Sequence, residues 1–156
     1  RIGHRSCAAP SRMMAAPVVS IRAASASDET TLALLDAAAR EEGTRHRGSP
    51  HLYESWGSFG ERWAQREDIF QFSVAIVDDT IVGFSVVRAA PRPLLDQVFV
   101  HPQARGLGVG SSILRHAVTS HGAENLDALS LPGDRLTKNL YERAGLKARL
   151  IIASAL

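Results

Sequence analysis

Only one cysteine, Cys7, occurs in the 156 residues, and there is no run of about 18 unbroken apolar residues. The lone cysteine excludes a disulfide within the chain and is typical of a reducing compartment, so we expect a cytoplasmic protein. Without a long apolar run, we expect a soluble chain with no membrane contact. The six histidines have no spacing typical of metal ligands, so no metal site is predicted.

The chain also lacks a strong excess of charge of one sign. It has 18 Lys and Arg residues against 16 Asp and Glu residues. Three of the arginines lie in the first 12 residues, which leaves 15 basic and 16 acidic groups in the rest of the chain. We therefore expect no nucleic-acid partner. Residues 1–16 are predicted to be a disordered extension, and residues 17–156 to form a single domain.

Hydrophobic patterns predict a mixed α/β sheet with helices on both faces. The short acidic link Asp78-Asp79-Thr80 favours a hairpin between two strands. Trp56, Phe59 and Trp63 are spaced to share one helical face, where they could form core or line an acceptor pocket. The predicted strands are 18–22, 72–77, 81–87, 94–100, 126–131 and 147–152, and the predicted helices are 28–43, 52–65, 108–120 and 136–143.

A glycine-rich turn joins the strand 94–100 to the helix that follows it. Gly106, Gly108 and Gly110 let the backbone turn sharply and approach a ligand without a Cβ atom in the way. Backbone N–H groups at a helix start carry partial positive charge, and Arg105 adds a full charge. The segment therefore predicts an anion site suited to a phosphorylated cofactor.

Several interpretations of this turn compete. A P-loop needs Lys before its final Ser or Thr, but Gly110 is followed directly by Ser111 and Ser112. A dinucleotide fingerprint needs G-x-G-x-x-G and an acid about 20 residues further on. Asp127 could be that acid, but the glycines run G-x-G-x-G and too little chain follows. A glycine-rich helix start that binds no ligand remains an alternative.

Another interpretation rests on a family resemblance. Gln103-Ala-Arg-Gly106-Leu-Gly108 fits the signature Q/R-x-x-G-x-G/A and follows Val100-His-Pro102, so the chain resembles the GNAT superfamily of acyl-CoA N-acyltransferases. Tyr141-Glu142-Arg-Ala-Gly145 resembles the C-terminal segment of that family. The matches span about residues 94–147. They imply a GNAT-like fold: a mixed, mostly antiparallel sheet with splayed central parallel strands, flanked by helices.

The resemblance also implies an activity. The chain would be an N-acetyltransferase that moves the acetyl group of acetyl-CoA to a primary amine of a small molecule or peptide by direct attack. Tyr141 would protonate the departing thiolate. The backbone of Val98, Phe99 and Val100 would pair with the pantetheine arm of coenzyme A, and the N–H groups of the turn would hold its pyrophosphate, namely Arg105, Gly106, Leu107, Gly108, Val109, Gly110 and Ser111.

Two positions depart from the family pattern, and the base is not evident. Asp134 stands where the family often has Asn, and Thr137 where it often has a small residue. The first candidate for a general base is Asp96, followed by Glu54 and His51, although a water relay would need none. The alternative functions are a non-catalytic CoA-binding sensor and a transferase for a longer acyl group. Homodimers are frequent in the family, so a homodimer is possible here.

Overall fold

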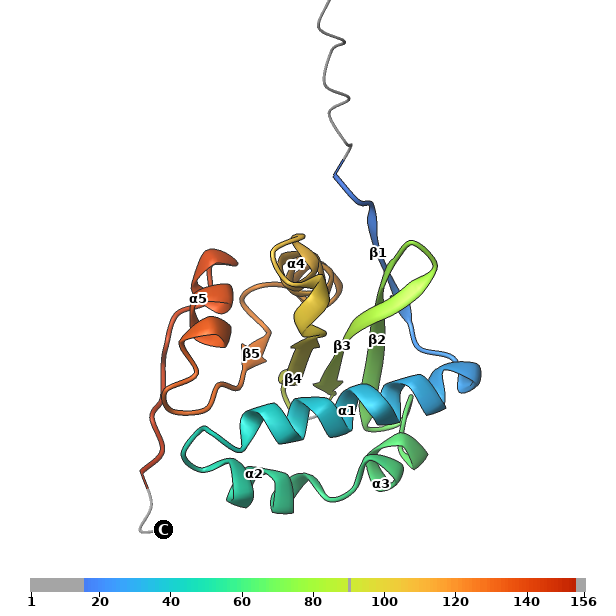
Figure 1. Ribbon diagram of the computed structural model, residues 1–156. Coiled ribbons are helices and arrows are strands. Elements are labelled where there is room, and N and C mark those ends of the chain that lie inside the picture. The colour runs from blue at the N-terminus through green and yellow to red at the C-terminus, as the bar shows by residue number, and fades with distance from the viewer. Residues whose placement is uncertain (1–15, 90, 154–156) are drawn as a thin grey trace, which may run out of the picture.

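The computed structural model describes residues 16–89 and 91–153, which fold around one twisted sheet (Figure 1). Its five strands follow one another in chain order across the sheet. Neighbours are antiparallel except for the last pair, which is parallel. This arrangement confirms the predicted mixed, mostly antiparallel fold class. The strands are β1 (Val19–Ala23), β2 (Phe70–Val77), β3 (Thr80–Arg88), β4 (Leu94–Val100) and β5 (Asp127–Ala128).

Helices cover both faces of this sheet. A first group lies on one face, and α4 and α5 lie on the other (Figure 1). The first group comprises the 3-10 turn η1 (Ala26–Asp28), α1 (Glu29–Gly43), α2 (Ser49–Trp56) and α3 (Phe59–Ala64). The second comprises the 3-10 turn η2 (Pro102–Ala104), α4 (Val109–His121) and α5 (Arg135–Arg143).

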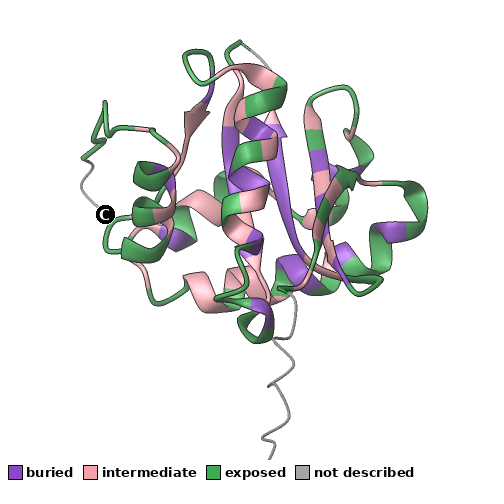
Figure 2. Ribbon diagram, turned by 90° about the horizontal axis from the view of Figure 1, so that it is seen from above, coloured by how far each residue is buried: buried purple, intermediate pink, exposed green. Residues whose placement is uncertain are grey.

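The core has a layer on each face of the sheet. Leu32 of α1 and Trp63 of α3 pack against Phe84 on one face. Leu114 of α4 packs against Leu95 on the other. Figure 2 shows the buried residues along the central strands. Full burial of such side chains stabilises the fold by about 1.5–3 kcal/mol each, which explains why the strand sequences are nearly continuous apolar runs.

The hairpin between β2 and β3 is confirmed. Val77 pairs with Thr80, so only Asp78 and Asp79 form the turn. Both have positive φ angles, 48° and 61°, as a type I′ turn requires. Asp tolerates this region better than most residues because its short side chain can hydrogen-bond locally.

The parallel strands β4 and β5 separate soon after they meet. Their pairing is limited to Leu94 with Asp127 and Leu95 with Ala128, and β4 then continues to Val100 paired only with β3. A register shift between β3 and β4 leaves Asp96 without a partner on β3. Such a bulge bends its strand and increases the local twist. The prediction of splayed central strands is therefore confirmed, and β4 has one free edge beyond Leu95.

The predicted helix over residues 52–65 is wrong, because two helices occupy this segment. Gly57 has a φ of 72°, which ends α2. Ser58 then caps α3: its hydroxyl accepts from the Glu61 N–H at 3.1 Å, and the Glu61 carboxylate accepts from the Ser58 N–H at 2.7 Å. The break removes Trp56 from the face that Phe59 and Trp63 share. These two stack on each other, with ring centroids 5.8 Å apart.

The predicted strand over residues 147–152 is also wrong, since the structure has no strand between residue 129 and residue 153. Ile151 is 88% exposed, and its neighbours Leu150 and Ile152 are also exposed. The expected strand over 126–131 shrinks to Asp127–Ala128. Apolar, β-branched residues form a strand only where a neighbouring strand offers an edge for pairing and where their side chains have a surface to pack against.

Some predictions concern residues outside those that the structure describes. These are Cys7 and, apart from Ala16, the whole predicted N-terminal extension. Across the described ranges, no helix is both long and apolar enough to cross a membrane. Within the same ranges, no three His, Cys, Asp or Glu residues come together in a way that could hold a metal ion.

Candidate active site

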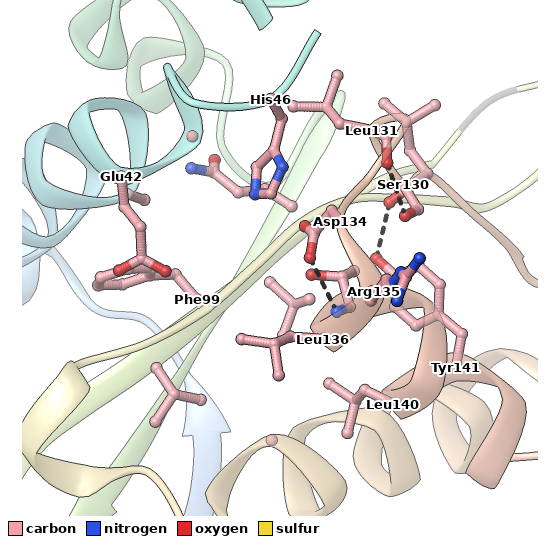
Figure 3. Close-up of a pocket in the computed structure, with 18 of the residues that line it drawn as sticks. Glu42, His46, Phe99, Ser130, Leu131, Asp134, Arg135, Leu136, Leu140 and Tyr141 are labelled. Atoms are coloured by element: carbon pink, nitrogen blue, oxygen red, sulfur yellow. Dashed lines mark hydrogen bonds between the residues drawn. The ribbon is translucent and has the colours of Figure 1, made fainter.

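A cavity of about 600 Å³ opens where β4 and β5 diverge. Its walls come from the end of α1, from α2, from the loop after β5 and from α5, and β4 forms its floor (Figure 3). Leu107 is 44% exposed and lies outside the lining. The cavity brings together the other site residues that the sequence predicted: Asp96, Val98, Phe99, Val100, Arg105, Gly106, Gly108, Val109, Gly110, Ser111 and Tyr141.

The glycine turn forms an open cradle at one end of the cavity. Gly106 and Gly108 have φ angles of 82° and 80°, and a Cβ atom at either position would meet nothing within 4 Å. Gly108 is the N-cap of the long helix α4, whose first N–H groups have no partner within the helix. These donors and the positive end of the helix dipole suit an anion. The residues present therefore fit a diphosphate group.

The side chain of Arg105 is already engaged in this structure. Its Nη2 atom donates to both carboxylate oxygens of Glu42, at 2.8 and 2.7 Å, and its Nε donates to the Val100 carbonyl at 3.0 Å. The ion pair links the glycine turn to the end of α1 across the cavity. Sequence reasoning missed Glu42 because the two residues lie 63 positions apart and no local pattern connects them.

Tyr141 lies in the wall of the cavity with its hydroxyl group hydrogen-bonded. The residue is 7% exposed, and its hydroxyl donates to the Leu129 carbonyl at 2.8 Å (Figure 3). Burial raises its pKa well above 10, and the negative charges of Asp134 and Asp96 raise it further. The hydroxyl is therefore protonated at neutral pH and can serve as a donor.

Asp134 caps the helix that carries Tyr141. Its Oδ1 atom accepts from the Thr137 N–H at 3.0 Å, the bond typical of an N-cap. Asn can make the same bond, so the departure from the family pattern at this position preserves the start of α5. Thr137 contributes to this cap through its backbone and lines the cavity.

Asp96 is enclosed by two guanidinium groups. It is 2% exposed, and its carboxylate accepts from Arg88 at 2.8 and 3.2 Å and lies 3.7 Å from Arg62. A proton on this carboxylate would weaken both ion pairs, so the geometry favours a structural role over that of a base. The other candidates, Glu54 and His51, are exposed on α2 and do not line the cavity.

Arg62 extends this cluster across the core beneath the cavity. The residue is 1% exposed and donates to Gln97 at 2.8 Å, and Gln97 in turn donates to Asp36 at 2.9 Å. Burial lowers the pKa of Arg62 to about 10, so it still carries its charge at neutral pH. We call Asp36, Arg62, Arg88, Asp96 and Gln97 the buried polar network.

The wall formed by α1 and α2 also contains residues that sequence reasoning missed. Tyr53 and Trp56 line the cavity with ring centroids 5.4 Å apart. Figure 3 shows Glu42 and His46 pointing into the cavity from this side, opposite Asp134 and Leu136. The spacing of Tyr53 and Trp56 places both on one face of a helix, which is a usable sequence signal. His46 lies on an irregular link and offers none.

Comparisons with known proteins agree with this geometry. A family model described as "Acetyltransferase (GNAT) domain" matches residues 68–147, just over half of the chain. The chain therefore belongs to the GNAT acetyltransferase family. Domains of this family use acetyl-CoA. No curated protein matches the sequence.

Solved structures show the same fold at low sequence identity. AAC(6′)-Iy, an aminoglycoside N-acetyltransferase solved with a CoA–acetylneamine bisubstrate analogue, is 19% identical with a TM-score of 0.62, over 89% of this chain and 99% of that one. A ribosomal-protein-alanine N-acetyltransferase from Brucella melitensis biovar Abortus 2308 is 19% identical with a TM-score of 0.62, over 88% and 96%. A mutant of the BH1408 protein from Bacillus halodurans is 18% identical with a TM-score of 0.71, over 87% and 98%.

Proposed function

We propose that the protein is an acetyl-CoA-dependent N-acetyltransferase that acts on a primary amine by direct attack. The observation that carries this proposal is the open glycine cradle, which lies in the same cavity as Tyr141. The reaction converts the amine and acetyl-CoA into an N-acetyl amide and free coenzyme A. The nitrogen lone pair forms the new C–N bond, the C–S bond breaks, and the amine loses a proton while the thiolate gains one.

Two features would hold the donor. The N–H groups at the start of α4 would bind its diphosphate, and the free edge of β4 would bind its pantetheine arm. Beyond Leu95 this edge has no strand partner, so the backbone of Val98 can pair with the amides of the arm as it would with another strand. The N–H of Val100 can do the same, while its carbonyl already accepts from Arg105. This arrangement would direct the thioester along β4 toward Asp96 and Tyr141.

Two groups would then stabilise the charge that develops during transfer. The bulge in β4 leaves Asp96 without a partner on β3. We propose that a backbone N–H group at this bulge donates a hydrogen bond to the carbonyl oxygen of the thioester. The Tyr141 hydroxyl would turn from the Leu129 carbonyl toward the sulfur. Because its pKa is raised, we assign it as a protonated donor to the developing thiolate.

We expect Tyr141→Phe to lower kcat by about 10- to 100-fold, because the thiolate loses its donor. The affinity for coenzyme A should stay within about twofold, since the cradle and the β4 edge are unchanged. Thiol release from acetyl-CoA with a panel of amines measures the first value, and calorimetry measures the second.

The variant also loses the bond to Leu129, which contributes about 1 kcal/mol, so its unfolding is measured alongside. An unchanged kcat in a folded variant would reject the role of Tyr141 as donor. Tight binding of coenzyme A with no turnover of any amine by the wild type would favour the non-catalytic sensor instead. A higher rate with longer acyl chains would favour a transferase for a longer acyl group.

A further inference from the structure

The charges of the cavity indicate what kind of amine it accepts. We infer that the acceptor carries a carboxylate beside its amine, and that this carboxylate is bound on the wall formed by α1 and α2. The inference rests on the proposed function and narrows the substrate class of the same cavity.

Two of the three carboxylates in the described lining are paired with cations. Glu42 is bound by Arg105, and Asp96 is held by Arg88 and Arg62. Asp134 caps α5 without a cation partner among the described residues, but it lies opposite the wall formed by α1 and α2 (Figure 3). A cation bound at that wall would have to displace Arg105 from Glu42, which costs free energy.

The cations of the wall formed by α1 and α2 are only partly paired with carboxylates. Arg45 lines the cavity on the link between α1 and α2, and its Nε donates to the backbone carbonyl of Glu42 at 3.1 Å. No carboxylate of the described residues lies within ion-pair distance of it. Its guanidinium is thus available for a carboxylate, to which Arg can bind in a bidentate manner.

A buried cation, Arg62, lies behind the same wall. The Arg62 guanidinium lies 4.5 Å from the ring centre of Trp56, a lining residue. Two of its nitrogen atoms are buried without a hydrogen-bond partner among the residues described. Charge interactions across a desolvated interior are stronger than in water. Asp96 and Asp36 of the buried polar network offset part of this charge, so Arg45 is the cation of this wall that we assign to the carboxylate.

Other arginines of the lining lie on α5. Arg135 and Arg143 line the cavity from this helix, which packs against α4, where the diphosphate would bind. Arg45 lines the cavity on the link between α1 and α2, and Tyr53 and Trp56 line it from α2. An arginine and two aromatic rings on one wall suit an acceptor with an apolar body and a carboxylate.

This arrangement also helps to explain the reaction without a dedicated base. A positive potential favours the neutral form of a nearby amine, which is the form that attacks the thioester. The proton can then leave through water.

The test uses the full chain and pairs of acceptors that differ only in charge. Each carboxylated amine, such as phenylalanine or 3-aminopropionate, is compared with its uncharged amide, and kanamycin and spermidine represent polycations. We expect kcat/KM for the best acid to exceed that of its amide by about tenfold or more at low salt, in line with a hydrogen bond to a charged group. In Arg45→Gln this ratio should fall to about one to two.

Arg47→Gln is the matched control, because Arg47 is exposed on the same link and does not line the cavity. This variant should keep the preference for the acid. Equal or faster acetylation of the amides or the polycations would overturn the inference, and so would an unchanged preference for the acid in Arg45→Gln. Either result would leave the proposed acetyltransferase activity intact. Binding of coenzyme A without acetylation of any amine would overturn both.

Discussion

Gly108→Asp is expected to weaken the binding of coenzyme A by about 100-fold or more. The new carboxylate would project into the open cradle, where it would occupy the space of the diphosphate and repel its charge. Like charges held together at an interface cost several kcal/mol, and each 1.4 kcal/mol is about a factor of ten in affinity. Calorimetric titration with coenzyme A measures the effect.

The fold should survive this change. Asp is a favourable N-cap residue and tolerates positive φ better than most side chains, so the start of α4 should remain helical. Gly145→Asp is the matched control: Gly145 has a φ of 88°, a Cβ atom there would also meet nothing within 4 Å, and it does not line the cavity. If both variants bind coenzyme A as tightly as the wild type, the diphosphate does not lie in the cradle.

Asp96→Asn is expected to destabilise the fold by about 3 kcal/mol, because removing one partner of a buried ion pair leaves the other uncompensated. Arg62 would then remain almost fully buried with only Gln97 as a hydrogen-bond partner. Arg88 is less affected, since its side chain is 41% exposed and can be hydrated. Urea denaturation at neutral pH measures the loss.

Asp127→Asn is the control for this variant. Asp127 also lies on a strand and pairs with an arginine, Arg92 at 3.0 Å, but its side chain is 46% exposed. The loss there should be below about 1 kcal/mol, as for most surface ion pairs. If Asp96→Asn instead matched the wild type in stability and lost its turnover, Asp96 would be the base after all.

The sequence was most informative where a local pattern requires one backbone conformation. Gly106 and Gly108 of the cradle and the two acidic residues of the hairpin turn have positive φ angles, which few other residues adopt easily. Their geometry could therefore be predicted without knowledge of the rest of the fold. The Ser58 and Glu61 capping box was an equally local signal, and it shows where the predicted helix over 52–65 should have been divided.

Contacts between distant segments could not be predicted in this way. The pairing of Glu42 with Arg105 and the buried polar network depend on how α1, α3 and β4 pack together, which no spacing along the chain reveals. The missing strand over 147–152 has the same cause. Its sequence is suited to a strand, but strand formation depends on a neighbouring edge, and β5 offers only Asp127–Ala128.

The proposed function and the expected effect of Gly108→Asp both require that the start of α4 binds the diphosphate of coenzyme A. The most direct measurement is a pair of calorimetric titrations of the wild-type chain, one with coenzyme A and one with pantetheine, which lacks the diphosphate and the 3′-phosphoadenosine attached to it. We expect coenzyme A to bind at least about 100-fold more tightly, a difference of about 2.7 kcal/mol, because only it carries the diphosphate that meets the N–H groups of the cradle. Equal affinities for the two compounds would show that these N–H groups do not bind the diphosphate.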